Sequence, residues 1–193
     1  MRYDQLFTGV LLISLSSCTK ELPPTEPPPG NTVIYYDKNS SAQVVSQIFN
    51  YNGQSEVNLT NDLMHNYWWI KVSGDKAKFL CYRSPKVNNN YLDNKSNDYA
   101  NADLMVFNID GTNPRVIIQK GKYGWSEQGV AKFSPDGTKI LMAALCVDPA
   151  SGNNDLHWRL IVTDVNGNNP KIISTRNSLF ADPAWSPDGK KIV

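Results

Sequence analysis

The side chains best suited to chemistry are few in this sequence and stand far apart. It has two histidines, His65 and His157, and neither Cys81 nor Cys146 has a histidine or another cysteine at metal-ligand spacing. A metal centre needs several such ligands together, so a lone histidine is more often a packing or surface residue. We therefore expect no metal, no other cofactor and no catalytic residue, and the sequence leans away from an enzyme.

Two short motifs come near known catalytic or metal-binding patterns and depart from both. "GWSEQG" (residues 124–129) places Ser126 two positions after a glycine, as a nucleophile elbow does, but Gln128 stands where the second glycine is required. "DNKSND" (residues 93–98) lacks the glycine of a calcium-binding EF-hand loop. Neither motif predicts an activity.

Aromatic side chains gather in the tripeptide "YWW", which is Tyr67, Trp68 and Trp69, and two further tryptophans are Trp125 and Trp185. Exposed rings could stack on sugars or peptides, whereas buried rings would fill a core. The sequence leaves Tyr67, Trp68 and Trp125 open between these two interpretations.

The composition excludes some classes of function. The chain has 19 basic and 18 acidic residues and a net charge of +1, which gives no long-range field to attract nucleic acid. Forty per cent of the residues are hydrophobic, enough for a globular core, and short runs of Val, Ile, Tyr and Phe favour β structure. No apolar stretch reaches the roughly 20 residues of a lasting transmembrane helix.

The first residues have the pattern of an export signal. "LFTGVLLISLSS" (residues 6–17) is an apolar run preceded by Arg2, and it leads into "LSSC". This resembles the lipobox of bacterial lipoproteins, in which the signal is cut before a cysteine that is then acylated; here that cysteine is Cys18. The alternative is an ordinary cleaved signal with an incidental cysteine. The recognition residues that the resemblance implies are Leu15, Ser16 and Ser17.

The segment after Cys18, "TKELPPTEPPPGN", is proline-rich and predicts an extended tether. We expect a signal peptide at residues 1–17, a lipid-anchored tether at 18–31 and a folded body at 32–193. Several acyl chains on Cys18 would hold the protein stably on a membrane. By resemblance to lipoprotein sorting, Thr19 in place of Asp after the cysteine favours the outer membrane of a bacterial envelope.

Two motifs alternate along the body with a shared period. "FSPDGTKI" starts at Phe133, "WSPDGKKI" at Trp185 and a degraded copy, "VSGDKAKF", at Val72, at spacings of 61 and 52 residues. The second motif is "LMVFNIDGTNPRVII", then "RLIVTDVNGNNPKII", with a looser copy "SQIFNYNGQSEVNLT" nearer the N-terminus. Two motifs with one period predict a repeat architecture. The turn glycines of the second motif are Gly53, Gly111 and Gly167, 58 and 56 residues apart.

Both motifs have the chemistry of a hairpin turn. In the first, Pro135 presets φ, Gly137 can take a positive φ, and the Ser134 hydroxyl can cap the turn. In the second, Asx-Gly dipeptides stand between alternating apolar runs, which is typical of tight hairpins. The turn residues to which we assign this structural role are Ser134, Pro135, Asp136, Gly137, Ser186, Pro187, Asp188, Gly189, Asp110, Gly111, Asn166 and Gly167.

Two hairpins per repeat make four strands, the sequence pattern of a β-propeller blade. We expect complete blades at about 66–118 and 124–174, and a further blade that begins at Asp182. Residues 32–60 read as the last three strands of a blade whose first strand a closed ring would take from the other terminus, removing open edges. Phe133 and Trp185 share a repeat position, and Trp69 lies near it, so we expect these rings in the core between blades.

Two further features accompany the blades. The loops at 84–102 and 148–155 join second and third strands and are polar and long for hairpins, so they are either functional loops or solvated insertions. Cys81 and Cys146 could pair in an exported protein. They stand at different offsets from their local repeats, however, and we favour two separate buried thiols.

These residues carry a resemblance to a family. "AKFSPDGTKI" and "PAWSPDGKKIV" resemble the SPDG repeat of the TolB-like β-propellers, and "NIDGTNPRVI" and "DVNGNNPKII" resemble its companion hairpin. The resemblance covers about residue 32 to the end and implies an all-β propeller of four-stranded antiparallel blades. About three blades are present. A six-bladed ring of about 55 residues per blade would need about 330, so we expect these 193 residues to be the N-terminal part of a larger ring.

The functional expectation is an envelope lipoprotein whose propeller binds or scaffolds an envelope protein, a peptide or a glycan. The alternative is a propeller enzyme. It would resemble either the oligogalacturonate lyases, with histidines around the channel, or a prolyl oligopeptidase-type hydrolase whose catalytic part lies beyond this sequence. Channel-facing histidines or a downstream G-x-S-x-G domain would favour the enzyme, and further bare repeats would favour binding.

Overall fold

The computed structural model describes residues 33–38, 46–51, 53–86, 98–147, 152, 155–174 and 182–193. The expected signal peptide, with Leu15, Ser16 and Ser17, lies outside these ranges, as do Cys18 and the tether. Most of the two long loops also lies outside them. Within the described ranges, the structure holds no helix with the length and apolar character needed to span a membrane.

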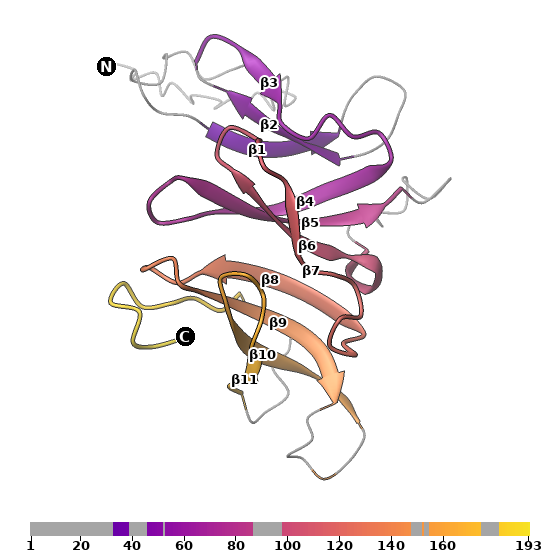
Figure 1. Cartoon of the computed structure of the whole chain (residues 1–193), viewed down its shortest axis with the longest axis vertical. Helices are drawn as coiled ribbons and strands as arrows, with labels where there is room; N and C mark the ends of the chain where they lie inside the picture. The colour runs from indigo at the N-terminus through magenta and orange to yellow at the C-terminus, as the bar shows by residue number, and fades with distance from the viewer. Residues whose placement is uncertain are drawn as a thin grey trace, which may run out of the picture.

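The described residues form three antiparallel sheets that follow one another along the long axis of the molecule (Figure 1). Sheet 1 has three strands, and sheets 2 and 3 have four each, every strand pairing with its neighbour in sequence. The strands of sheet 1 are β1 (Val33–Lys38), β2 (Ser46–Tyr51) and β3 (Glu56–Asn58). Those of sheet 2 are β4 (His65–Val72), β5 (Lys78–Pro85), β6 (Asp103–Asn108) and β7 (Arg115–Ile118), with the short 3-10 helix η2 (Tyr99–Asn101) before β6. Those of sheet 3 are β8 (Glu127–Phe133), β9 (Lys139–Val147), β10 (Leu156–Asp164) and β11 (Lys171–Ile172).

This arrangement confirms the predicted fold class, a partial β-propeller of antiparallel blades. Sheets 2 and 3 are the two complete blades, and a bridge between Trp185 and Ile192 opens a further hairpin. Sheet 1 has the three strands expected of a blade without its first strand. Strand β1 is an outer strand of this sheet, and it pairs with β2.

Sheet 2 is buried on both faces, which explains why its strands are apolar almost throughout. Along β5, Phe79 and Cys81 point into the cluster shared with sheet 1, and Leu80 and Tyr82 into the cluster shared with sheet 3. Successive side chains of a strand face opposite sides, so the middle of a strand packed between two blades has apolar residues on both faces. We call the contact of sheets 1 and 2 the first interface and that of sheets 2 and 3 the second.

The first strands of sheets 2 and 3 carry the same irregularity. Their pairing slips between Trp68 and Lys71 in β4, and between Gly129 and Lys132 in β8. The residues inside these bulges, Trp69 and Val130, have positive φ angles of 59° and 52°. A bulge bends its strand, and its recurrence 61 residues later shows that the bend belongs to the repeat.

Each SPDG-type turn is held by the same three hydrogen bonds. In the central copy, Gly137 N donates to Ser134 O (2.9 Å), Ser134 Oγ donates to Asp136 Oδ1 (2.5 Å) and Lys139 N donates to Ser134 Oγ (2.9 Å). The last copy repeats the pattern around Ser186. The degraded copy does so too, although Lys76 takes the positive φ that a glycine adopts elsewhere.

The glycines of the companion turns also bring neighbouring blades together. A Cβ on Gly167, at φ +74°, would lie 2.5 Å from Ile118 Cγ1 and 2.6 Å from Ile117 O of sheet 2. A Cβ on Gly111 would lie 3.0–3.2 Å from Leu59 of sheet 1. These turns therefore need glycine for close packing between blades as well as for the turn itself.

Most of the aromatic residues singled out in the sequence lie in or against the hydrophobic core. Trp68 and Tyr67, left open by the sequence, are buried in the second and the first interface respectively. Trp69, Trp125 and Phe133 are partly buried against the second-interface cluster.

The cysteines are separate. Cys81 and Cys146 are buried thiols outside any disulfide, Cys81 at the first interface and Cys146 at the second.

Candidate functional site

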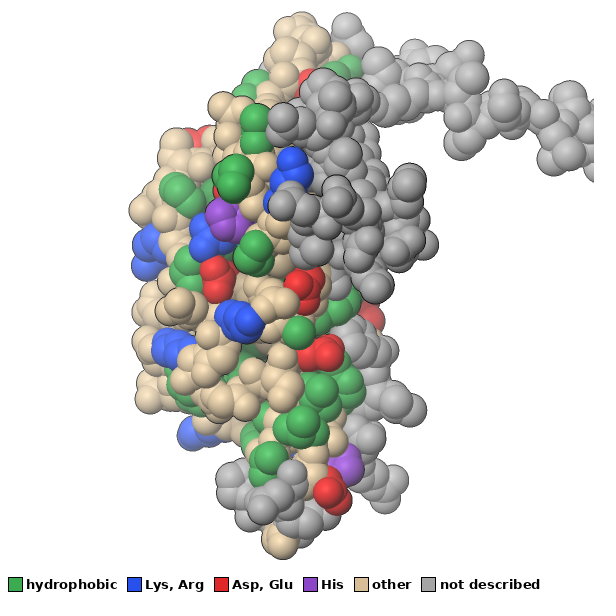
Figure 2. Space-filling view, turned by 90° about the vertical axis from the view of Figure 1, so that its right-hand side faces the viewer, with side chains coloured by type: hydrophobic (Ala, Val, Ile, Leu, Met, Phe, Trp, Pro, Cys, Tyr) green, Lys and Arg blue, Asp and Glu red, His purple; other side chains and the backbone are tan. Residues whose placement is uncertain are grey.

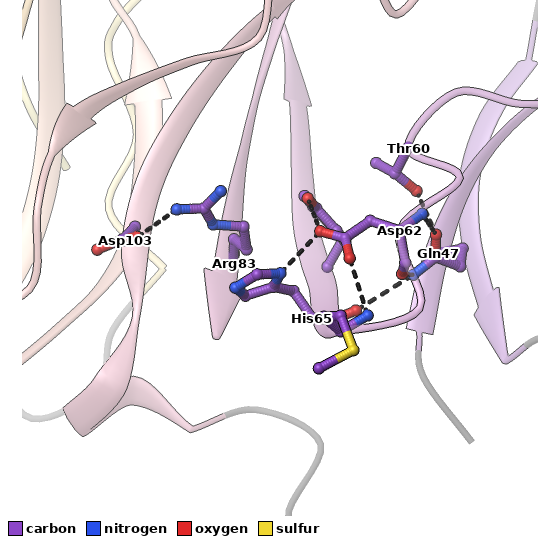
Figure 3. Close-up of polar contacts among 8 residues, drawn as sticks. Gln47, Thr60, Asp62, His65, Arg83 and Asp103 are labelled. Carbon is purple, nitrogen blue, oxygen red and sulfur yellow. Dashed lines mark hydrogen bonds and ion pairs between the residues drawn. The ribbon is translucent and has the colours of Figure 1, made fainter. Parts of the chain in front are cut away.

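The segment between β3 and β4 is fixed in place by a glutamine of sheet 1. Gln47 Oε1 accepts hydrogen bonds from Thr60 Oγ1 (2.8 Å) and from Asp62 N (2.9 Å). Gln47 Nε2 donates to Asp62 O (2.5 Å). A side chain that satisfies both ends of one residue's backbone leaves that residue little freedom, so Asp62 is held above the first interface (Figure 3).

The Asp62 carboxylate is the centre of a polar cluster. Oδ2 accepts from Tyr67 OH (2.8 Å) and lies 2.7 Å from His65 Nδ1, and Oδ1 accepts from Met64 N (2.8 Å). Partial burial raises the pKa of Asp62, but these hydrogen bonds outweigh it and the pKa lies below its ordinary value. Burial, together with the bond to Asp62, raises the pKa of Tyr67 well above its ordinary value.

An ion pair between Arg83 and Asp103 continues the cluster across sheet 2. Tyr67, Arg83 and Asp103 stand opposite one another on β4, β5 and β6, on the face toward sheet 1. Arg83 Nη2 donates to Asp103 Oδ2 (2.7 Å), and Asp103 Oδ1 accepts from Lys120 N (3.0 Å). Burial lowers the pKa of Arg83, but the hydrogen bond to Asp103 and the interactions with Tyr67 together outweigh it and leave the pKa raised.

This cluster orients His65 but supplies it with no reacting partner. An aspartate on Nδ1 fixes the orientation of the ring, as it does for the imidazole of a general base. The hydroxyl beside it, that of Tyr67, is buried with a raised pKa, so it is a poor nucleophile. Across the described parts of the chain, no three His, Cys, Asp or Glu side chains come together as metal ligands would. The cluster links sheets 1 and 2 by hydrogen bonds, and the His65 imidazole within it is partly exposed.

Two apolar side chains stand beside that imidazole. Met64 is 69% exposed and Leu63 is 46% exposed. The backbone that carries them is fixed on both sides, because Asp62 bonds to Gln47 of sheet 1 and Met64 O accepts from Lys86 N next to β5 (2.8 Å). Figure 2 shows the side of the molecule where β5 and β9 end, with hydrophobic, basic and acidic side chains interspersed over the described residues.

The second interface has a different polar row at the same repeat positions. Gln128, Ala144 and Arg159 stand opposite one another on β8, β9 and β10, on the face toward sheet 2. Gln128 Nε2 donates to Ala102 O of sheet 2 (2.5 Å). Gln128 Oε1 is buried, and it has no partner among the described residues.

The turn residues singled out in the sequence lie at the opposite ends of β4 and β8 from this cluster. The structure brings the turns of successive repeats together: Asp136 and Pro135 line a hollow with Asp188 and Pro187. Hydrogen bonds from the Ser134 hydroxyl and from the amide and hydroxyl of Thr138 lower the pKa of Asp136 to about 2. Asp110 and Asn166 occupy the companion turns, whose glycines pack against the preceding blade.

Sequence reasoning missed Asp62, Arg83 and Asp103, because none lies in a repeat motif and their partners are distant in sequence. It treated His65 as a lone packing or surface residue. The one local signal was Asp62 three residues before His65 in "DLMH", a spacing that can pair the two.

The comparisons with known proteins agree with this fold. No family model matches the sequence. A stretch of 41 residues is 45% identical to the Tol-Pal system protein TolB of Wigglesworthia glossinidia brevipalpis, which covers 21% of this chain and 10% of that protein. The structure is similar to that of TolB from Acinetobacter baumannii, with a TM-score of 0.57 and 15% identity over 83% of this chain and 35% of that chain. It is also similar to the structure of prolyl endopeptidases, with a TM-score of 0.54 and 17% identity over 83% of this chain and 24% of that one.

The chain is thus a partial β-propeller. More particularly, its fold is similar to that of TolB, and the stretch of 41 residues is similar in sequence to a TolB protein. It spans about a tenth of the curated relative and about a third of the TolB structure. At these identities the structural likeness shows the fold alone, since one propeller architecture serves unrelated functions.

Proposed function

We propose that this protein is a lipoprotein of the bacterial cell envelope whose TolB-like propeller binds a protein partner. The export signal with its lipobox-like "LSSC" supports the envelope location and an anchor at Cys18, and Thr19 supports the outer membrane. The partial match to a protein of the Tol-Pal system supports an envelope role.

The observation that carries the binding role is the surface formed by Leu63, Met64 and His65, which we call the docking edge. Leu63 and Met64 are exposed although the backbone beneath them is fixed by hydrogen bonds to Gln47 of sheet 1 and to Lys86 just after β5 of sheet 2. Holding an apolar group in place before binding lowers the entropy cost of association. Methionine is an adaptable contact residue that suits a protein surface. An ordered, exposed apolar edge therefore fits a protein partner.

Photocrosslinking in living cells tests the binding role. A photoreactive amino acid replaces Met64 in one variant and Val116, which is 41% exposed on β7, in a control variant. We expect a discrete adduct of higher mass from position 64 and none from position 116. The adduct should disappear when Leu63→Asp is added, because a charge there repels an apolar contact. Equal crosslinking at both positions, or an adduct that survives Leu63→Asp, would refute the docking edge.

The anchor has a separate test. Cys18→Ala removes the thiol that acylation requires, so we expect the protein to move from the membrane fraction to the soluble fraction. Metabolic labelling with a fatty-acid analogue should mark the parent protein and not the variant. Continued membrane attachment of Cys18→Ala would refute the lipoprotein assignment and leave the docking edge to be judged on its own evidence.

A further inference from the structure

The two ends of the blades carry different features. Neighbouring strands run in opposite directions, so the SPDG-type turns after β4 and β8, and the turn of the hairpin between Trp185 and Ile192, lie at one end of the described sheets. We call this the turn end, and it is on the left of Figure 1. At the opposite end, which we call the loop end, β4 and β8 begin and β5 and β9 end.

The docking edge belongs to the loop end. Leu63 and Met64 directly precede His65, the first residue of β4. Met64 O accepts from Lys86 N, and Lys86 directly follows the last residue of β5. Figure 2 looks onto this end of the molecule. A partner that contacts the docking edge therefore approaches from the loop end.

The first described strand begins at the other end. Val33, the first residue of β1, pairs with Tyr51, which lies two residues before the turn glycine Gly53. In sheets 2 and 3, the second strands β5 and β9 begin directly after the SPDG-type turns. Strand β1 has the same place and direction in sheet 1, because it pairs with β2 as β5 pairs with β6 and as β9 pairs with β10. The residues that precede Val33 in sequence therefore join the sheets at the turn end, a full strand length from the docking edge.

The sequence before Val33 predicts a spacer that continues outward from the turn end. It holds five prolines, at 23–24 and 27–29, and such a segment is extended and semi-rigid. The 14 residues 19–32 would span about 43 Å at about 3.1 Å per residue, whereas the nine residues of β9 span about 30 Å. To bring the loop end to a membrane that holds Cys18, the spacer would have to reverse beside β1 and run back along most of its own length. A semi-rigid chain opposes that reversal.

We infer that the anchored protein directs its turn end toward the membrane and presents the docking edge on the far side, to a protein partner outside that membrane. This inference rests on the lipid anchor at Cys18 that the proposed function assigns. The described sheets share the same two ends, so the orientation set by β1 holds for sheets 2 and 3 as well. A partner embedded in the same membrane would meet the SPDG-type turns, and one beyond it would meet the docking edge.

Energy transfer from the protein to the lipid surface tests this orientation. The acylated protein is purified from membranes and added to preformed phosphatidylcholine vesicles that carry an acceptor dye on the lipid headgroup. A donor dye is coupled to an azido amino acid at Lys139, which begins β9, or at Leu156, which pairs with Val147 at the end of β9, and both positions are exposed. Because these positions lie about 26 Å apart along sheet 3, we expect transfer from position 139 to exceed that from position 156 by about twofold or more.

A second pair of positions lies on sheet 2. Lys78 begins β5 at the turn end and Met64 lies at the docking edge, so this pair should give the same order. Replacing the five prolines by serine keeps the length of the spacer and removes its stiffness, so the difference within each pair should shrink. Equal transfer within both pairs in the parent protein, or greater transfer from the loop end, would overturn the inference.

Vesicle flotation, measured first, separates this inference from the proposed function. Protein that does not float refutes the lipid anchor, and the orientation with it. Protein that floats but shows no difference between the two ends refutes the orientation alone and leaves the anchor and the docking edge standing. Thermal unfolding checks that each labelled variant folds, and should one pair fail to fold, the other decides.

Discussion

At the first interface, sheet 2 presents Tyr67, Arg83 and Asp103 to sheet 1, and every one of these side chains has a charged or hydrogen-bonded partner. At the second interface the row at the same repeat positions is Gln128, Ala144 and Arg159. Apolar residues and turns repeat faithfully between the two blades, while the polar row changes in residue type and in charge. The repeat therefore specifies the blade, and the polar rows are where individual blades acquire different properties.

The largest expected effect concerns the glycines that bring the blades together. Gly167→Ala should destabilise the chain by about 3 kcal/mol or more, because its Cβ would lie 2.5–2.6 Å from sheet 2 and φ is positive. Gly111→Ala at the first interface, with contacts of 3.0–3.2 Å, should cost less. Gly137→Ala meets no atom within 4 Å and should cost about 1 kcal/mol, from backbone strain alone. Urea unfolding measures the three, and an equal cost for all would show that glycine serves only the turn.

The next effect comes from breaking the Arg83–Asp103 ion pair, whose repeat positions at the second interface are occupied by Ala144 and Arg159. Arg83→Ala leaves Asp103 half-buried without its cation and should cost about 2 kcal/mol. The control is Lys132→Ala, whose partner Asp182 is mostly exposed and whose loss should cost less than about 1 kcal/mol. Chemical denaturation compares the two variants. A loss for Arg83→Ala no larger than that of the control would mean that the row contributes little to the first interface.

A smaller effect separates the two equivalent positions at the starts of β4 and β8. Tyr67→Phe removes a hydrogen bond to Asp62 and should cost about 1 kcal/mol. Gln128→Met loses its bond to Ala102 O but also removes a buried acceptor without a partner, so the two changes should cancel to within about 0.5 kcal/mol. Thermal unfolding at neutral pH compares them, and the reverse order would contradict the difference drawn between the interfaces.

The smallest effect is the pH dependence of the first interface. Since the pKa of Asp62 is lowered in the folded state, its carboxylate contributes stability that is present above the unfolded value of about 3.9 and is lost as pH falls through the folded value. Asp62→Asn lacks this titration, so the parent should lose more stability than the variant between neutral and acidic pH. Urea midpoints measured across that range provide the test. Parallel curves would show that Asp62 is not coupled to folding.

The sequence was sufficient to predict the blades, because their determinants are local. Turn chemistry at residues 134–137 and the apolar runs on each side specify a hairpin without reference to the rest of the molecule. The polar rows could not be predicted in the same way. Arg83 and Asp103 are twenty residues apart, and their pairing depends on strand register after a long loop.

The burial of Tyr67 and Trp68 could not be settled from the sequence either. Both faces of sheet 2 are covered, so neither side of its strands is reserved for solvent, and an aromatic residue on either side becomes core. The orphan acceptor of Gln128 depends on a single backbone carbonyl in another sheet, which no sequence pattern encodes. The expectations for Cys18 and its recognition residues stay predictions.

The two buried thiols have a practical consequence. Cys81 packs within the contact between sheets 1 and 2, and Cys146 within that between sheets 2 and 3. Burial raises the pKa of the Cys81 thiol, so this thiol reacts with alkylating reagents only when its surroundings open. In a Cys18→Ala background, the alkylation rate of each thiol can be followed by mass spectrometry. That rate measures how often the interface around the thiol opens. Each of the first and second interfaces thus contains a natural reporter of local opening, and the relative alkylation rates tell which interface opens more readily.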